Sequence, residues 1–334
     1  MPKTLAVAIN YNGAKFIPHF CERLFDLQAE NLDFLFLDNA STDNSVELVR
    51  EVAPSLVIHQ TGKNDGYAGA AEIAFRLAQK RGYDYLLLMG TDIVFEADYA
   101  KILVEKMEQD RSLGAAVGKL YKYEFFSQQK TRILDSCGLL AYRDRRIVDR
   151  GQAQSDVGQF DREEFVFGAT GAAPLYRVEA LADIEVLAEV FDQDFFMYKE
   201  DVDVSWRLQL FGHQILYVPT AVAHHGRGTG IYKRNSYWQI ANERKNLSRF
   251  QKTFSYRNHK LMQLKNELGA NLLHDFWPIC RREVLFTGYM TLFEPYLYVW
   301  LIKFLILMPK FSRKRRAIMR RKHVDADYMQ QFFV

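Results

Sequence analysis

The chain has 334 residues, of which 49% are hydrophobic and 25% are charged. This is the composition of an ordinary globular protein, and it excludes collagen-like, disordered and low-complexity chains. The three cysteines lie far apart without a CxxC pair. This spacing argues against a disulfide scaffold or a cysteine-rich zinc site and suits a reducing compartment. The first ten residues become polar too soon for a signal peptide.

Charge is divided unevenly along the chain. Residues 231–334 contain 20 Lys and Arg against 7 Asp and Glu, whereas residues 1–230 contain 24 against 34. An acidic body joined to a basic tail indicates two regions with different tasks. We therefore expect one domain over residues 1–230 and a distinct C-terminal region over residues 231–334.

Residues 1–120 alternate short apolar runs with segments of helical spacing. Strands are expected at Leu5–Ile9, Phe34–Leu37, Leu56–Ile58, Tyr85–Met89 and Ala115–Leu120. Helices are expected at Lys15–Leu27, after the capping residues Ser41-Thr42-Asp43, at Gly69–Arg81 and at Ala97–Glu108. This rhythm predicts a doubly wound α/β sheet.

The rhythm is lost over residues 121–165, where we expect loops and a small hairpin. Further helices are expected near Val178–Leu187 and at Val204–Phe211. A strand at Gln214–Val218 should end at Pro219, and residues 231–334 should be helical.

The C-terminal region contains a long apolar stretch, Val284–Met308. It is interrupted by Glu294, Pro295 and Lys303, and its uninterrupted runs are shorter than the ~20 residues that span a bilayer. Eight Lys and Arg follow within Lys310–Lys322. An aromatic, apolar stretch before a polybasic cluster predicts a helix lying in the interface of an anionic membrane. The alternative is a core helix followed by a solvated run of charges.

Two polar motifs follow apolar runs in the first half of the chain. Asp38 begins DNASTD (38–43) at the carboxyl end of an expected strand, where open α/β sheets bind ligands. A carboxylate there can accept the imide N–H of a pyrimidine, although simple helix capping explains the motif as well. In NDGYAGA (64–70), the small residues let the backbone approach a phosphate or sugar at a helix N-terminus.

Acidic residues and histidines supply the remaining candidates. Asp92 follows an apolar strand, and its oxygens suit Mg²⁺ or Mn²⁺ on a diphosphate, with a loop cap as the alternative. Asp192–Asp203 is acidic and unusually aromatic. Crowded carboxylates raise one another's pKa, which favours a general base; a charged helix N-terminus would explain only part of the stretch. Of the adjacent His224 and His225, only one should face the cleft, because neighbouring strand positions point to opposite sides.

Taken in order, these motifs resemble family-2 glycosyltransferases of the GT-A fold, particularly the rhamnosyltransferase-like members that build cell-surface polysaccharides. The matching segments are INYNG (9–13), LDNASTDNS (37–45), NDGYAGA (64–70), LLLMGTDIVFEAD (86–98), GATGAAPLYRVEAL (168–181), FDQDFFMYKEDVDVSWRLQLFGHQILYVP (191–219) and AHHGRG (223–228). The resemblance covers residues 5–230. It implies a GT-A mixed sheet with a helical C-terminal extension, a nucleotide-sugar donor and a divalent metal, Mg²⁺ or Mn²⁺.

The resemblance also implies where the donor would bind. The base would be held by Asn10, Tyr11 and Asp38. The nucleotide–sugar pocket would be lined by Asn64, Gly66 and Tyr67.

The metal motif departs from the family pattern. Asp92 matches its last acid, but Gly90 stands in place of the first. His225, rather than His224, matches the family's later histidine that contacts metal or phosphate.

The catalytic base would be Asp201, in the pair that it forms with Glu200. The acceptor side would be bordered by Gly168, Gly171 and Asp203. One base without an enzyme nucleophile implies inversion at the anomeric carbon, whereas glycosidases flank the bond with two carboxylates.

We therefore expect an inverting glycosyltransferase that moves rhamnose from dTDP-rhamnose to a glycan or lipid-linked acceptor. Its basic tail would place it peripherally at the cytoplasmic face of the membrane. Nucleic acid is not an expected partner, because the basic residues follow an apolar stretch and no nucleic-acid-binding fold is apparent. Two alternatives stay open: a transferase of the same fold that uses a UDP-hexose, and a non-catalytic membrane-surface binding protein on a degenerate transferase fold.

Overall fold

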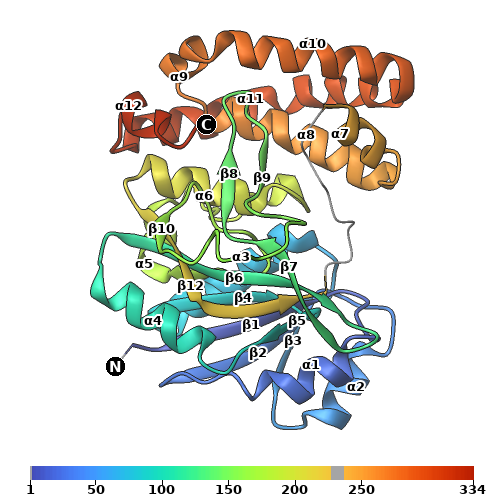
Figure 1. Ribbon diagram of the computed structural model, residues 1–334, viewed down its shortest axis with the longest axis vertical. Helices are drawn as coiled ribbons and strands as arrows, with labels where there is room; N and C mark the ends of the chain where they lie inside the picture. Colours follow the sequence, from blue (N-terminus) through green and yellow to red (C-terminus); the bar gives the residue numbers. More distant parts are fainter. Residues whose placement is uncertain (1, 227–236) are drawn as a thin grey trace.

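The structure, a computed structural model, describes residues 2–226 and 237–334. Gly228 and Gly230 of the sequence AHHGRGTG lie outside these residues. Among the described residues, ten strands form one mixed sheet with helices on both sides (Figure 1). The strands of the sheet are β1 (Thr4–Asn10), β2 (Leu32–Asp38), β3 (Val57–Gln60), β4 (Tyr85–Gly90), β5 (Ile93–Phe95), β6 (Leu113–Glu124), β7 (Gln129–Ser136), β10 (Glu164–Phe165), β11 (Leu175–Arg177) and β12 (Gln214–His225). A separate hairpin consists of β8 (Leu139–Ala141) and β9 (Ile147–Asp149).

The order of the strands brings the predicted motifs to one edge of the sheet. Strands β3, β2, β1 and β4 run parallel, β11 is antiparallel between β4 and β6, and β12 runs parallel to β6. In this register Asn10 lies opposite Asp38, and Ile9 lies opposite Gly90. The carboxyl ends of three parallel strands therefore meet at one level, as open α/β sheets require of a ligand site.

Alternating residues of each strand fill two separate layers of the core. In β1, Leu5, Val7 and Ile9 belong to one hydrophobic cluster, whereas Ala6 and Ala8 belong to the other. This alternation follows from the two-residue period of a strand. The sheet is accordingly covered by helices on both faces, which explains why its central strands are continuously apolar.

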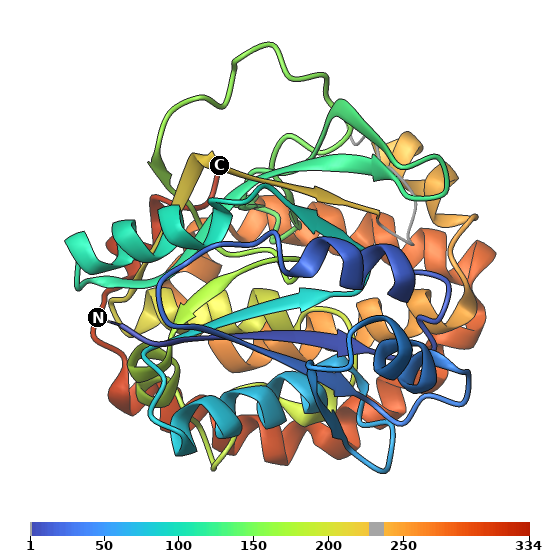
Figure 2. The same ribbon diagram turned by 90° about the horizontal axis from the view of Figure 1, so that it is seen from below.

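The helices of the body are α1 (Ile17–Leu24), α2 (Ser45–Val52), α3 (Gly66–Lys80), α4 (Tyr99–Gln109), α5 (Val178–Asp183), the 3₁₀ turn η1 (Gln193–Phe195) and α6 (Glu200–Leu210). The first face of the sheet, to which Ala6 and Ala8 belong, is covered by α1, α2 and α4. The second face, to which Leu5, Val7 and Ile9 belong, is covered by α3, α5 and α6. Figure 2, seen from below, shows α1 in front of the sheet and the orange C-terminal helices behind it.

The C-terminal residues form a helical layer on top of the second face (Figure 1). Its elements are α7 (Tyr237–Arg244), α8 (Arg249–Asn266), α9 (Gly269–His274), α10 (Phe276–Phe293), the 3₁₀ turn η2 (Pro295–Leu297), α11 (Tyr298–Arg321) and α12 (Ala326–Gln330). Leu261, Phe311, Ile318 and Phe333 of this layer belong to the same hydrophobic cluster as the body. The two regions therefore share one core, and the division at residue 230 stays a prediction.

Over residues 121–165 the expected loops and small hairpin are present, the hairpin as β8 and β9, although β6 also extends to Glu124 and pairs with β7. Two other local expectations were wrong. Helix α6 begins at Glu200 instead of Val204, with three acidic residues in its first turn that interact favourably with the helix dipole. Strand β12 continues through Pro219, where a register shift between Val218 and Val222 removes the need for a proline N–H donor.

None of the described helices alone has the length and apolar composition of a membrane span. Helix α10 and the segment Pro295–Arg321 meet both criteria only together, with a bend of 113° between them. At the bend, the buried Glu294 pairs with Arg244 at 2.8 Å and with Lys252 at 3.5 Å.

Candidate active site

A cavity of about 1110 Å³ lies between the carboxyl edge of the sheet and the C-terminal helices. Its floor comes from the loops after β1 and β4, the end of β12 and the start of α6, and its roof from α7, α8 and α10. Nine predicted site residues line it: Tyr11, Asn64, Gly66, Tyr67, Asp92, Gly171, Glu200, Asp201 and His225. The other four, Asn10, Asp38, Gly168 and Asp203, are buried behind its surface.

Asn10 and Asp38 contact each other at the ends of β1 and β2. The Asn10 amide donates to the Asp38 carboxylate at 2.9 Å, and the backbone N–H of Ser41 donates to its second oxygen at 3.1 Å. The Asp38 side chain is 1% exposed, so in this structure the carboxylate supports the loop that borders the cavity. Its contact with a base stays a prediction.

Asn39 was missed as a site residue. Its amide donates to the Asn64 side chain at 3.1 Å and to the Gly66 carbonyl at 3.0 Å, which ties the loop after β2 to the start of α3. It stands inside the DNASTD motif, so the sequence did offer a signal. Gly66 has φ +70°, and a Cβ there would lie 2.1 Å from the carbonyl oxygen of Phe196. This position therefore requires glycine.

His225 and Asp92 converge at the floor of the cavity. The Nε2 atom of His225 lies 3.6 Å from an oxygen of Asp92, and its Nδ1 atom lies 2.8 Å from Asp135. Burial would lower the pKa of His225, but the carboxylates of Asp92 and Asp135 raise that pKa to about 10. His224 points away and contacts Glu96 at 2.9 Å, which confirms that only one of the two histidines faces the cavity. Asp135 was missed because its segment was expected to be a loop.

These donors fit a divalent cation. Carboxylate oxygen and imidazole nitrogen are ligands of Mn²⁺, and two ligands at about 2.1 Å from one ion lie some 3 to 4 Å apart. A Cβ at position 90 would lie 2.7 Å from the nearer oxygen of Asp92. Gly90 therefore leaves room for the single remaining carboxylate of the motif. Because His225 must lose its proton to bind metal, metal binding there should strengthen as pH rises.

Glu200 and Asp201 are the first two residues of α6, and both line the same cavity. The Asp201 carboxylate accepts hydrogen bonds from the backbone N–H groups of Gly171 at 3.0 Å and Val202 at 2.8 Å. Burial raises the pKa of both acids; in Glu200, burial and the negative charge of Asp201 raise the pKa to about 8. Tyr67 donates to the carbonyl of Gly171 at 2.8 Å, so the donor-side and base-side loops touch.

Asp203 and Gly168 do not reach the cavity. Asp203 is 0% exposed and accepts hydrogen bonds from Arg207 at 2.9 Å, Lys265 at 2.8 Å and Asn266 at 2.8 Å. A Cβ at Gly168 would lie 2.6 Å from the Cβ of Ser205. Both residues therefore hold α6 in place, and no contact in the structure supports their predicted place at the acceptor.

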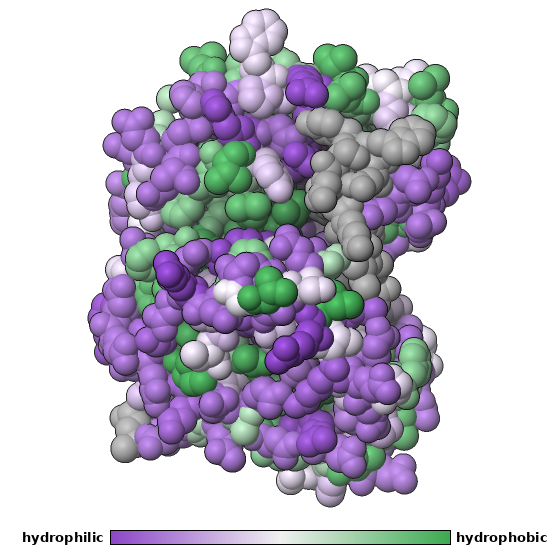
Figure 3. Space-filling model, in the orientation of Figure 1, coloured by the Kyte–Doolittle hydropathy of each residue, from purple (hydrophilic) through white to green (hydrophobic). Residues whose placement is uncertain are grey.

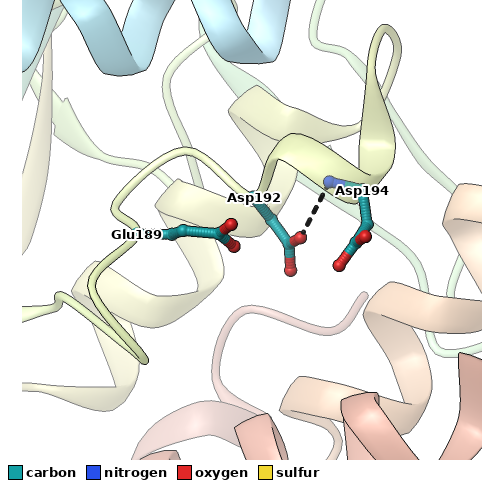
Figure 4. A group of neighbouring side chains, drawn as sticks. All are labelled: Glu189, Asp192 and Asp194. Carbon is teal, nitrogen blue, oxygen red and sulfur yellow. Dashed lines mark hydrogen bonds between the residues drawn. The ribbon is translucent and has the colours of Figure 1, made fainter.

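A second acidic group, Glu189, Asp192 and Asp194, lies apart from the cavity (Figure 4). Lys314 contacts all three carboxylates, at 2.9, 2.5 and 3.0 Å respectively. Burial would raise the pKa of Asp192, but Lys265 and Lys314 lower that pKa instead. The expectation that crowding raises the pKa values is thus wrong for this part of the stretch, and an ammonium group stands where a cation would bind.

The comparisons with known proteins agree with this geometry. Residues 6–184 match the family model Glycosyl transferase family 2. Over 218 residues, the chain is 25% identical to a poly-beta-1,6-N-acetyl-D-glucosamine synthase of Staphylococcus aureus (strain COL), covering 64% of this chain and 47% of that protein. The poly-beta-1,6-N-acetyl-D-glucosamine synthase of Staphylococcus epidermidis is 23% identical over 279 residues, covering 81% of this chain and 62% of that protein. The chain thus spans about half the length of the first relative.

Two solved structures show the same fold. GalNAc-T7 with UDP, GalNAc and Mn²⁺ matches with a TM-score of 0.53 at 12% identity, covering 78% of this chain and 52% of that one. The mannosyltransferase PcManGT of Pyrobaculum calidifontis, in complex with GDP-Man and Mn²⁺, matches with a TM-score of 0.50 at 14% identity, covering 96% and 86%. Together with the family model, which matches more than half of the chain, the mixed sheet and its edge site show that this chain belongs to glycosyl transferase family 2.

Proposed function

We propose that the protein is an inverting glycosyltransferase that moves a sugar from a nucleotide-sugar donor to a hydroxyl group of a glycan or lipid-linked acceptor in cell-surface polysaccharide synthesis. The observation that carries the proposal is that Asp92, Asp201 and His225 line one cavity, although His225 lies 133 positions after Asp92 in the chain. A metal-suited pair and a carboxylate base are the two elements that a direct displacement requires.

Each residue has a distinct task in this mechanism. Asp92 and His225 would hold a divalent cation, which would stabilise the charge that develops on the leaving diphosphate. Asp201 accepts the proton of the attacking hydroxyl, and the N–H of Gly171 orients its carboxylate for that purpose. Displacement by the acceptor itself inverts the anomeric centre.

dTDP-rhamnose is the donor that we propose first, because the motif order resembles rhamnosyltransferase-like members of the family. A UDP-hexose, in particular UDP-N-acetylglucosamine, is the second candidate, because the curated relatives are named poly-beta-1,6-N-acetyl-D-glucosamine synthases. Hydrolysis and transfer measured with dTDP-rhamnose, UDP-glucose and UDP-N-acetylglucosamine in Mn²⁺ decide between them. A D201N variant should lose about 10²- to 10⁴-fold in kcat with the active donor and keep its affinity for the nucleotide. Absence of turnover with every donor would instead support a non-catalytic binding protein.

We also propose that the protein lies at the cytoplasmic membrane surface through α10 and α11. Several large apolar side chains of these helices are exposed: Trp277, Val284, Leu292, Phe293, Val299, Ile302, Leu305 and Ile306. In Figure 3, apolar side chains reach the surface of the upper, helical part in several places. Arg313, Arg316 and Arg320 are exposed further along α11, whereas Lys314, Arg315 and Arg321 are bonded within the protein. Only part of the polybasic cluster is therefore available to anionic lipid.

Cosedimentation with vesicles that contain phosphatidylglycerol tests this placement. A double variant, I302D with I306D, should reduce binding severalfold, because each charge opposes burial of the apolar face. Val157 is exposed on the body, so V157D is the matched control and should bind as the wild type does. Equal binding of both variants would refute the contribution of α11.

A further inference from the structure

The roof of the cavity differs in charge from its floor. Among the described lining residues, the floor carries three carboxylates, from Asp92, Glu200 and Asp201, against Lys199 and His225, whose pKa is raised; the β8–β9 hairpin adds Asp149 and Arg146. The roof carries four cations, from Arg244, Lys245, Lys260 and Arg282, against the carboxylates of Glu243 and Glu283. A floor of this kind suits a metal and a base, whereas the roof suits an anion.

Two of the roof cations form one compact group on α8 and α10. Lys260 and Arg282 both form ion pairs with Glu283, and the distance from Arg282 to Glu283 is 3.0 Å. Arg282 also lies 3.0 Å from the Nε2 atom of His259. Burial, together with Arg282 and Lys260, holds the pKa of His259 well below its usual value. His259 is therefore neutral, and two cations face one carboxylate in this group. Burial also lowers the pKa of Lys260, so a further negative charge beside it would be favourable.

An aromatic wall runs along the same roof. Tyr256 stacks on Phe286 with ring centroids 5.3 Å apart, and Tyr289 follows at 6.4 Å from Phe286 and 5.0 Å from Phe293. Phe293 and Leu285 of α10 both line the cavity, and they are 62% and 47% exposed, respectively. The wall thus leads from the cationic group to the exposed apolar face of α10.

We propose that Lys260 and Arg282 form a phosphate-binding subsite for the acceptor, whose apolar chain lies along Tyr256, Phe286 and Tyr289 and leaves the cavity at Phe293. The proposal rests on the function proposed above, and it narrows the acceptor to an amphiphile with a phosphate or diphosphate group. The cavity, at about 1110 Å³, exceeds the usual size of a site for one small molecule, so a donor and an acceptor head group can be accommodated together.

Binding of farnesyl diphosphate, farnesol and inorganic diphosphate to the full chain tests the subsite without requiring turnover. The titrations are made in EDTA, so that diphosphate is not drawn to metal at Asp92. Farnesyl diphosphate should bind more tightly than either fragment. K260Q and R282Q should each weaken it about ten- to hundredfold, as expected for the loss of a charge-assisted contact. Farnesol binding should not change.

Matched variants separate the subsite from general charge and from misfolding. Arg281 is exposed beside Arg282 and does not line the cavity, so R281Q carries the same charge change and should bind as the wild type does. E283Q should tighten binding, because it removes the carboxylate that competes with the phosphate.

The outcomes also separate this inference from the proposed function. Unchanged farnesyl diphosphate affinity in K260Q and R282Q would overturn the subsite, even if the enzyme transfers sugar. Inorganic diphosphate binding as tightly as farnesyl diphosphate would overturn the role of the aromatic wall and indicate a site for free phosphates. Phosphate-dependent binding in a protein that turns over no nucleotide sugar would leave the subsite standing and reject the transferase.

Discussion

The side-chain amide of Asn258 donates a hydrogen bond of 2.7 Å to the carbonyl oxygen of Tyr198. The same amide donates to the carbonyls of Phe195 at 2.9 Å and Met197 at 2.8 Å. These carbonyls belong to the loop between η1 and α6. The loop contains three non-glycine residues of positive φ, Phe196, Tyr198 and Lys199, and each such backbone conformation costs roughly 1 kcal/mol or more. Glu200 and Asp201 follow directly. A fully buried residue of the C-terminal layer thus holds the strained loop that presents the base.

We expect N258A to impair catalysis more than donor binding. The substitution removes a donor from buried carbonyls and should lower the free energy of unfolding by about 1–3 kcal/mol. Relaxation of the loop should also move Asp201 and reduce kcat by tenfold or more, whereas the affinity for UDP or dTDP should stay near that of the wild type. Chemical denaturation and steady-state kinetics measure the two effects.

N271A is the control for this prediction. Asn271 is also buried, and its amide donates to Ala326 and Gln330 at 2.8 Å, away from the loop. It should lose stability without a matching loss of kcat. If both variants lose kcat equally, Asn258 has no positioning role.

The two histidine–carboxylate pairs at the end of β12 should respond differently to substitution. D135N removes the charge that orients and polarises His225, so the Mn²⁺ concentration for half-maximal activity should rise about 10- to 100-fold. E96Q makes the same change beside His224, which faces away from the cavity, and should leave Mn²⁺ dependence unaltered. Equal Mn²⁺ profiles for the two variants would argue against His225 as a ligand.

The pH dependence of kcat/KM should reveal the carboxylate pair. The base acts in its ionised form, so activity should rise with pH through the raised pKa values of Glu200 and Asp201. Lys199 lowers the pKa of Asp201 and Asp149 raises it. K199Q should therefore move the rising limb to higher pH, and D149N should move it to lower pH. Shifts in the same direction would show that another group controls the limb.

Lys314 should be essential to stability, although it lies in a segment that the sequence presents as a polybasic tail. It is buried against three carboxylates. K314Q removes the ammonium group that all three share, and among the described residues only Asp192 and Asp194 keep a second lysine partner, Lys265 and Lys310 respectively. We expect a loss of about 3–5 kcal/mol in the free energy of unfolding. R316Q, at an exposed position two residues away, should change it by less than about 0.5 kcal/mol. Thermal and urea unfolding of both variants make the comparison.

The sequence predicted those features that depend on local periodicity and motif order. The strand of Tyr85–Met89, the helix expected at Gly69–Arg81 and the expectation that only one of His224 and His225 faces the cavity all follow from spacing, and the structure confirms them. The prediction failed where partners are distant in sequence. Asp135 and Asp203 owe their environments to His225 and Lys265, which lie 90 and 62 residues further along the chain. Periodicity carries no information about such pairs.

The roof of the cavity illustrates the same difficulty. Tyr256, Lys260 and Arg282 stand at ordinary helical positions, and nothing in their spacing indicates a site. They reach the cavity only because α8 and α10 pack over the edge of the sheet. The basic excess of residues 231–334 was visible in the sequence, but the structure uses it partly for ion pairs with the body and partly for the roof.

The core shared by the sheet and the C-terminal helices governs how the molecule comes apart. Since Phe311, Ile318 and Phe333 lie in the same cluster as Leu5 and Val7, the acidic and basic halves should denature in a single cooperative transition. A truncated catalytic body would expose that apolar surface to water and tend to aggregate. Exchange of this C-terminal region for that of another transferase would therefore require its inner face to be redesigned together with the sheet-side residues that it covers.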